Sequence, residues 1–134
     1  MAVFAYTDAY LVLNSVNLSD HCKSVALTID VAQLDSTAMG DTYTEMIGGL
    51  KSGSLSITFN DDFASGSVDA TIAAALGTVV TFELRPTSAA VGATNPKWTG
   101  SVLVAGNSIG GGVGELGAKS VTFPTSGTVT RATS

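Results

Sequence analysis

The chain has 134 residues and a formal net charge of −5 at pH 7, and 13% of its residues are charged, about half the usual fraction. This length fits one domain over residues 1–134, which can bury roughly two-thirds of its unfolded surface. The lack of a basic patch disfavours ordinary binding to nucleic-acid phosphates. The acidity fits either plain solubility or a surface past which a polyanion moves without sticking.

The chain opens with two predicted strands. Residues 10–14 are mostly apolar and predict a short strand, and the polar residues 17–21 predict a turn whose side chains bond neighbouring backbone. Residues 24–32 alternate with the period of a half-covered antiparallel strand. The apolar face of this strand holds Val25, Leu27, Ile29 and Val31, and its polar face holds Ser24, Thr28 and Asp30.

Residues 33–48 show neither a strand period nor a helix period, and they predict a long loop. At roughly 15 residues this loop exceeds most connections, and such loops tend to be functional or disordered. Its apolar content argues against simple disorder. Because Met and Tyr are enriched at interfaces, the loop is a candidate for docking on a neighbouring subunit. The equally weighted alternative is an arm folded back on its own core.

The clearest alternation runs through residues 52–60 and predicts a half-buried strand. Its polar face holds Ser52, Ser54, Ser56, Thr58 and Asn60, and its other face holds Gly53, Leu55, Ile57 and Phe59. Residues 67–77 predict the one helix, with Ser67 as N-cap, Asp69 in the first turn and Gly77 at the end. A narrow apolar stripe of Val68, Ile72 and Leu76 should pack this helix on a sheet.

The second half of the chain predicts four further strands separated by loops of small residues. The predicted strands span residues 78–85, 98–105, 118–123 and 128–131. Several short strands with one helix indicate a mainly β fold, an antiparallel β-sandwich or barrel with one flanking α-helix. Ser and Thr make up about a quarter of the chain, which fits strands whose hydroxyl surface is covered by another subunit, or else a β-rich secreted domain.

Candidate chemical sites are few. His21 and Cys22 have no second His or Cys with which to form a metal site, and a structural role is favoured. The lone cysteine forms no internal disulfide, the N-terminus does not resemble a signal peptide, and no apolar stretch reaches membrane-spanning length, so we expect a protein made in a cytoplasm. Asp61 and Asp62 are adjacent on an extended chain and point apart, so they do not predict a carboxylate dyad.

Two other features invite functional interpretations. The glycine-rich residues 110–117 lack the Gly-Lys-Ser/Thr ending of a P-loop, and a tight turn explains them better. Trp98 is a candidate platform for stacking a sugar, although a core or interface anchor is commoner. Nothing in the sequence predicts catalysis, a cofactor or a metal.

The order of several segments resembles the tail tube proteins (major tail proteins) of long-tailed bacteriophages, especially those of actinobacteriophages. The resemblance spans most of the chain, and it lies in the order of the segments. They are Asn17-Leu-Ser-Asp-His-Cys-Lys-Ser-Val, Met39-Gly-Asp-Thr-Tyr-Thr-Glu, Gly49-Leu-Lys-Ser-Gly-Ser-Leu-Ser-Ile-Thr-Phe-Asn-Asp-Asp-Phe, the helix, Arg85-Pro, Asn95-Pro, Gly114-Glu-Leu and Thr122-Phe-Pro-Thr-Ser-Gly.

The resemblance implies a structural virion protein of the tail, assembled in the host cytoplasm. Six subunits would close a ring, and rings would stack into a tube whose lumen holds the tape measure protein and conducts DNA without specific binding. Terminator and tail-tip proteins would contact the ends of the tube, and no membrane would be involved. By the same resemblance, the loop between rings would include Leu34, Asp35, Met39, Asp41, Tyr43, Glu45 and Met46. The candidates for the lumen face are Thr28, Asp30, Ser54, Ser56, Thr58 and Glu83.

Two other functions remain as alternatives. A tail terminator or head–tail joining protein would form a single ring that never stacks. A β-sandwich binding module, such as a capsid-decorating or sugar-binding domain, would use Trp98 as its platform.

Overall fold

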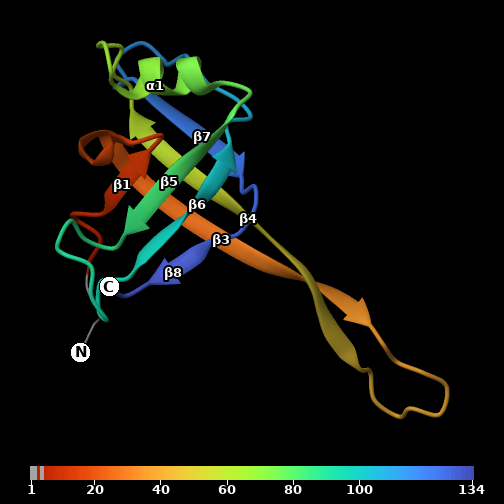
Figure 1. The fold of residues 1–134 in the computed structure, drawn as a ribbon. Helices are drawn as coiled ribbons and strands as arrows, with labels where there is room; N and C mark the ends of the chain where they lie inside the picture. Colours follow the sequence, from red (N-terminus) through yellow and green to blue (C-terminus); the bar gives the residue numbers. More distant parts are fainter. Residues whose placement is uncertain (1–2, 4) are drawn as a thin grey trace.

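The computed structural model describes residues 3 and 5–134. It confirms a mainly β fold in which two antiparallel sheets form a sandwich with one flanking helix (Figure 1). The five-stranded sheet has the order β2-β1-β5-β6-β8, and the three-stranded sheet has the order β3-β4-β7. The strands are β1 (Tyr10–Leu13), β2 (Val16–Asn17), β3 (Cys22–Asp35), β4 (Met46–Asn60), β5 (Val79–Arg85), β6 (Lys97–Leu103), β7 (Ala118–Pro124) and β8 (Thr130–Ala132).

The core lies between the two sheets, whose strands cross in Figure 1 at a large angle. Because side chains alternate across a strand, the predicted apolar faces point inward and the hydroxyl faces point outward. The fully or nearly buried residues form one cluster. They are Leu11, Leu13, Leu18, Leu55, Ile57, Phe59, Val68, Ile72, Ala75, Val80, Phe82, Val102, Val104, Val121 and Phe123.

The helix α1 (Val68–Ala75) covers one end of the sandwich and buries Val68 and Ile72 in this cluster. Ser67 occupies the N-cap position as predicted, but its hydroxyl makes no capping hydrogen bond. The predicted apolar stripe was wrong at Leu76, which is 51% exposed. The helix stops one residue earlier, and the backbone at Leu76 turns to an extended ψ of 126°, which carries the side chain off the packed face.

The largest departure from the sequence prediction is the loop over residues 33–48. β3 continues to Asp35 and β4 begins at Met46, so the two strands form one long hairpin closed by residues 36–45. The hairpin projects far from the sandwich (Figure 1). The strand period is hard to see in the sequence because the pairing of β3 with β4 shifts by one residue between Val31 and Gln33. This shift interrupts the alternation of side chains in the hairpin. The short strand β2 was not predicted, and β1, β5, β6, β7 and β8 begin and end within two residues of the prediction.

Candidate functional site

Five of the six residues predicted for the lumen lie on one face of the three-stranded sheet. The register pairs Thr28 with Ser54, and Ser56 and Thr58 continue the same face of β4. Asp30 lies opposite Ser52 at the end of this face where the arm begins. The sheet therefore gathers the predicted residues on its outer surface, away from the core.

Hydroxyl groups bridge the strands of this outer face. The Ser56 Oγ and Thr122 Oγ1 atoms are 3.1 Å apart, and the Thr58 Oγ1 and Ser120 Oγ atoms are 3.0 Å apart. Cross-strand hydroxyl pairs of this kind stabilise the pairing of the strands. The surface is largely uncharged, and we call it the hydroxyl face; its rows are Ser24–Thr58–Ser120, Ala26–Ser56–Thr122 and Thr28–Ser54–Pro124.

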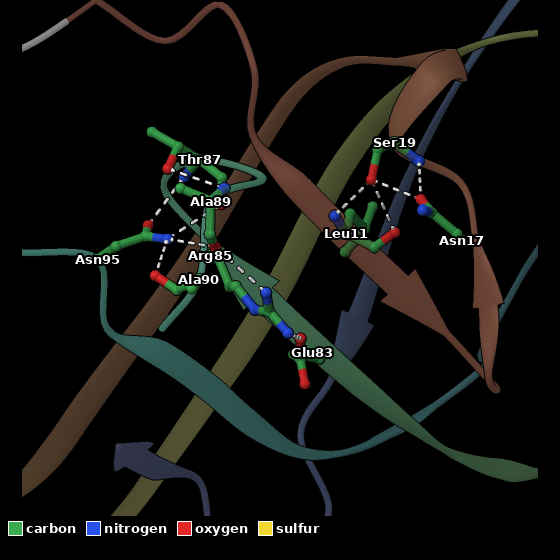
Figure 2. Close-up of polar contacts among 9 residues, drawn as sticks. All are labelled: Leu11, Asn17, Ser19, Glu83, Arg85, Thr87, Ala89, Ala90 and Asn95. Carbon is green, nitrogen blue, oxygen red and sulfur yellow. Dashed lines mark hydrogen bonds and ion pairs between the residues drawn. The ribbon is translucent and has the colours of Figure 1, made fainter. Parts of the chain in front are cut away.

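Glu83, the sixth candidate, does not share the hydroxyl face. It lies on β5 in the other sheet, where its carboxylate is 2.7 Å from the Arg85 guanidinium (Figure 2). The same guanidinium stacks over the Tyr10 ring at 4.4 Å from the ring centroid, a cation–π geometry. The Glu83 carboxylate therefore belongs to a local ion pair on a different surface.

The predicted inter-ring residues all lie on the projecting part of the hairpin. Every residue from 31 to 48 is exposed, and we call this segment the arm and its closing residues 36–45 the tip. Leu34, Asp35 and Met46 were predicted in a loop but lie in paired strands, whereas the other four predicted residues lie in the tip. The exposed large apolar residues of the arm are Val31 (45%), Leu34 (49%), Met39 (102%), Tyr43 (85%), Met46 (49%) and Ile47 (56%).

The tip has its own hydrogen bonds and projects away from the sandwich (Figure 1). The Asp41 carboxylate accepts a bond from the Ala38 N–H at 2.8 Å, and the Glu45 N–H donates to the Thr37 hydroxyl at 2.8 Å. Hydrogen bonds from the Thr37 hydroxyl and N–H lower the pKa of Asp35. These bonds fix the shape of the tip locally, and the arm is not folded back on the core, which removes that alternative.

The structure also reveals an apolar groove that sequence reasoning missed. It has a volume of about 480 Å³ and lies beside the β3 edge, between β3 and the joined ends of β5 and β6. Tyr6 of the N-terminal segment lines it, and its other apolar lining residues are Val25, Ala26, Leu27, Ile29, Leu84, Pro86 and Trp98. The prominence of Trp98 in the sequence was the available signal, but the groove combines residues from three strands whose packing is not local in sequence.

A buried amide orders the loop that joins β5 to β6, next to the groove residue Pro86. Asn95 is 7% exposed, and its Nδ2 donates to the Ala89 carbonyl at 2.9 Å and to the Ala90 carbonyl at 3.2 Å (Figure 2). Its Oδ1 accepts from the Thr87 N–H at 3.1 Å. Because a buried amide without partners is costly, this complete set of bonds holds the loop that follows Pro86 in one shape.

A buried lysine joins the helix end of the molecule. The Lys119 ammonium is fully buried and lies 2.8 Å from the Asn107 side-chain oxygen, 3.3 Å from the Asp69 carboxylate and 3.5 Å from the Asp61 carboxylate. The cation therefore ties the first turn of α1 and the loop after β6 to β7. Asp61, which was predicted to form no carboxylate dyad with Asp62, has Lys119 as its ionic partner.

His21 and Asp62 form a second polar link at the same end. The Asp62 Oδ2 and Ser67 Oγ atoms lie 2.7 Å and 3.5 Å from the same ring nitrogen, Nε2 of His21. A serine–histidine–aspartate relay needs the hydroxyl and the carboxylate on opposite ring nitrogens, so this arrangement is a structural contact. Hydrogen bonds from the Ala64 N–H, the Ser67 hydroxyl and His21 lower the pKa of Asp62. Burial raises the pKa of the adjacent Cys22 thiol, which disfavours the reactive thiolate.

Within residues 3 and 5–134, no three His, Cys, Asp or Glu side chains gather closely enough to hold a metal ion. The described part of the chain also has no helix of the length and apolarity that a membrane crossing requires. Two large surfaces stand out in the structure, the largely uncharged hydroxyl face and the exposed, partly apolar arm.

Two solved structures have a similar fold. A chain in the virion of a native gene transfer agent particle aligns with a TM-score of 0.79 over 97% of this chain and 99% of that chain, at 13% sequence identity. A chain in the tail of an empty gene transfer agent particle, refined with helical and C6 symmetry, gives a TM-score of 0.66 over 82% of this chain and 81% of that chain, at 14% identity. No family model and no curated protein matches the sequence. The resemblance to phage tail proteins is thus confirmed as a likeness of fold.

Proposed function

We propose that this chain is a structural subunit of a phage-like tail tube, in which rings of six subunits stack around a lumen. The observation that carries the proposal is the bare apolar arm, on a fold that a chain of a phage-like virion shares over 97% of this chain. A two-stranded ribbon in water is marginally stable by itself, and large exposed apolar patches mark interaction sites. A partner that covers the arm therefore accounts for a feature that a solitary globular protein would not keep.

Ring closure would use the open edges of the three-stranded sheet. β3 and β7 are its edge strands, and each presents unpaired backbone groups along most of its length. Such edges are templates for pairing with another chain, and a closed ring of sheets removes them. In the proposed ring, the β7 edge of one subunit meets the β3 edge of the next.

The hydroxyl face would then line the lumen. Its members Thr28, Ser54, Ser56 and Thr58 offer weak, exchangeable contacts, and Asp30 adds a sparse negative charge that repels phosphates. Such a wall suits a lumen that first holds a tape measure protein and then conducts DNA. Glu83 is left out of the proposed wall because it lies on the other sheet.

The remaining features follow from the role of a tube subunit. The protein would be assembled in the host cytoplasm and reside in the virion tail, where its partners are copies of itself, the tape measure protein, and the terminator and tip proteins. We propose no catalytic role and no membrane partner for it.

Electron microscopy of the concentrated full chain tests this function, and rings or tubes are the expected result. Replacing residues 36–45 by Asn-Gly should close the hairpin directly between Asp35 and Met46, because that dipeptide favours a two-residue hairpin turn. This variant should keep the melting temperature of the subunit but should no longer stack. The matched control is Val113→Ser, at a fully exposed apolar residue outside the arm. A strictly monomeric wild-type protein under all conditions would contradict the proposal.

The same images separate a tail terminator or joining protein, which would give single rings at every concentration. The groove lined by Trp98 favours, as a second candidate, a sugar-binding or capsid-decorating module. In that case Trp98→Ala would abolish ligand binding and leave assembly untouched.

A charge reversal in the proposed lumen, Asp30→Lys, should leave tubes intact and slow DNA passage, which ejection assays on particles carrying the variant can measure.

A further inference from the structure

The groove and the tip are chemically matched surfaces at different places on the molecule. We propose that the tip of one copy of this chain docks in the Trp98 groove of a second copy. The proposal rests on the proposed tube function, in that it requires self-association, and it assigns the surface that receives the arm.

A tip cannot reach the groove of its own chain. Ile29 is part of the groove wall, and β3 runs from there to Asp35 in an unbroken pairing with β4 apart from one slip. At about 3.3 Å per residue, this stretch holds the start of the tip about 20 Å from Ile29. Folding the tip back would break the ladder of backbone hydrogen bonds, so a tip that docks in this groove must come from another molecule.

The apolar parts of the two surfaces complement each other. Met39 and Tyr43 project from the tip with 102% and 85% of their surfaces exposed, whereas the groove is concave and mostly apolar. Methionine fills irregular apolar spaces, and tyrosine contributes a large contact at a small cost in side-chain entropy. Trp98 supplies an aromatic wall against which either side chain can pack.

The charges of the two surfaces also complement each other. The arm carries Asp35, Asp41 and Glu45 and has no Lys, Arg or His between residues 31 and 48. Arg85 lines the groove. Arg131 is exposed and lies directly opposite Trp98 in the β6–β8 pairing, hence on the same side of the sheet. Arg85 is already paired with Glu83 at 2.7 Å, so the exposed Arg131 is the charge that would attract the acidic tip and orient the contact.

The tip is shaped before it docks. Its internal hydrogen bonds, including those from the Ala38 N–H to Asp41 and from the Glu45 N–H to Thr37, hold the turn without any outside partner. The loop that follows the groove residue Pro86 is likewise held by Asn95. Association then loses little conformational freedom on either side. Because tip and groove are different surfaces, the contact is head-to-tail and can repeat without limit.

Trp98 is the single tryptophan of the chain, so its fluorescence reports directly on the groove. In the wild-type protein, assembly should shift the Trp98 emission to shorter wavelength as the tip covers the ring. The double variant Met39→Ser/Tyr43→Ser should need about thirtyfold more protein to assemble, the effect of losing a central interface residue, and should show no shift at wild-type concentrations. The control Val113→Ser should behave as the wild type does. This measurement leaves the groove itself unaltered.

A mixing experiment tests the direction of the contact. The groove variant Ile29→Asp and the tip double variant should each stop at the elementary unit, whether that is a subunit or a ring. When mixed, they retain one intact tip and one intact groove between them, so the mixture should form a species of doubled mass that grows no further. Val79→Asp, at an aliphatic strand residue outside the groove that is 54% exposed against 39% for Ile29, is the control. Mass photometry and electron microscopy distinguish these products.

Each outcome has a definite meaning. Wild-type tubes with no Trp98 shift, normal growth of Ile29→Asp, or variants that do not pair when mixed would overturn the proposed docking while leaving the tube function intact. A Trp98 shift caused by oligosaccharides and not by assembly would assign the groove to a sugar instead. Absence of any wild-type assembly would overturn the tube function and the docking together.

Discussion

The same two strands, β3 and β4, are packed in the body of the molecule and bare in the arm. Ile57 and Ile47 both lie on β4 and both pair with β3, yet Ile57 is 2% exposed and Ile47 is 56% exposed. The backbone hydrogen bonds are therefore alike in the two regions, and burial is what differs. Burial of side chains stabilises the body, whereas the arm keeps its shape from its ladder and tip and leaves its apolar surface available to a partner.

The largest expected effect compares these two isoleucines directly. Ile57→Ala should lower the free energy of unfolding by about 4 kcal/mol, because it leaves a cavity in the core. Ile47→Ala should change it by less than about 0.5 kcal/mol in the free subunit. Denaturant titration of both variants measures the difference. Equal losses would mean that the arm is packed in solution.

A somewhat smaller loss is expected from removing the buried cation. Lys119→Met should destabilise the subunit by about 3 kcal/mol, because the Asp61 carboxylate, only 5% exposed, would be left without its counter-charge. Lys51→Met, at an exposed residue of β4 near the arm, serves as the control and should be almost neutral. If the two variants unfold alike, the Lys119 cluster does not hold the helix end together.

Lowering the pH should affect the global stability of the body but only the local structure of the arm. The pKa of Asp62 in the body and that of Asp35 in the arm are both lowered by hydrogen bonds. Their contributions are present above the unfolded pKa of about 3.9 and are lost as the pH falls through the lowered folded values. Asp62→Asn should therefore flatten the loss of global stability in acid. Asp35→Asn should alter only the hydrogen exchange of the tip, and a global effect would contradict the independence of the arm.

The smallest expected effects concern two turns. Ser15, between β1 and β2, has a φ of 65°, which costs a non-glycine residue energy, so Ser15→Gly should stabilise the body by about 0.5–1 kcal/mol. Gly40 in the tip has a φ of 95°, and Gly40→Ala should strain the tip without changing global unfolding. Thermal melts check the first variant, and amide exchange of the tip checks the second.

Much of the body could be predicted from sequence because alternation is a local signal. The inward residues Leu55, Ile57 and Phe59 and the outward Ser54, Ser56 and Thr58 follow directly from a period of two. The length of the arm was missed because Gly48 and Gly49 and a one-residue slip interrupt that period. An exposed ribbon can carry apolar residues on both of its faces. Such a pattern matches neither the strand period nor the helix period.

The groove and the ion pairs could not be predicted, for a different reason. Trp98, Ile29 and Arg85 come together only through the packing of two sheets, and the Lys119 cluster joins segments far apart in sequence. Likewise Glu83 looked like a wall residue because its strand alternates, but alternation does not say which sheet a strand joins. Pairing between distant strands is set by the whole core.

The paired ladder of the arm makes it a spacer of fixed length. From Val31 to Asp35 the paired ribbon spans about 13 Å at roughly 3.3 Å per residue, so in the proposed docking it would set the distance between the body of one molecule and the place where its tip binds. Such a spacer can change only in steps of two residues per strand, about 7 Å, because a single added residue would turn every following side chain to the opposite face. The repeat distance of an assembly built on the proposed contact would therefore change only in such two-residue steps.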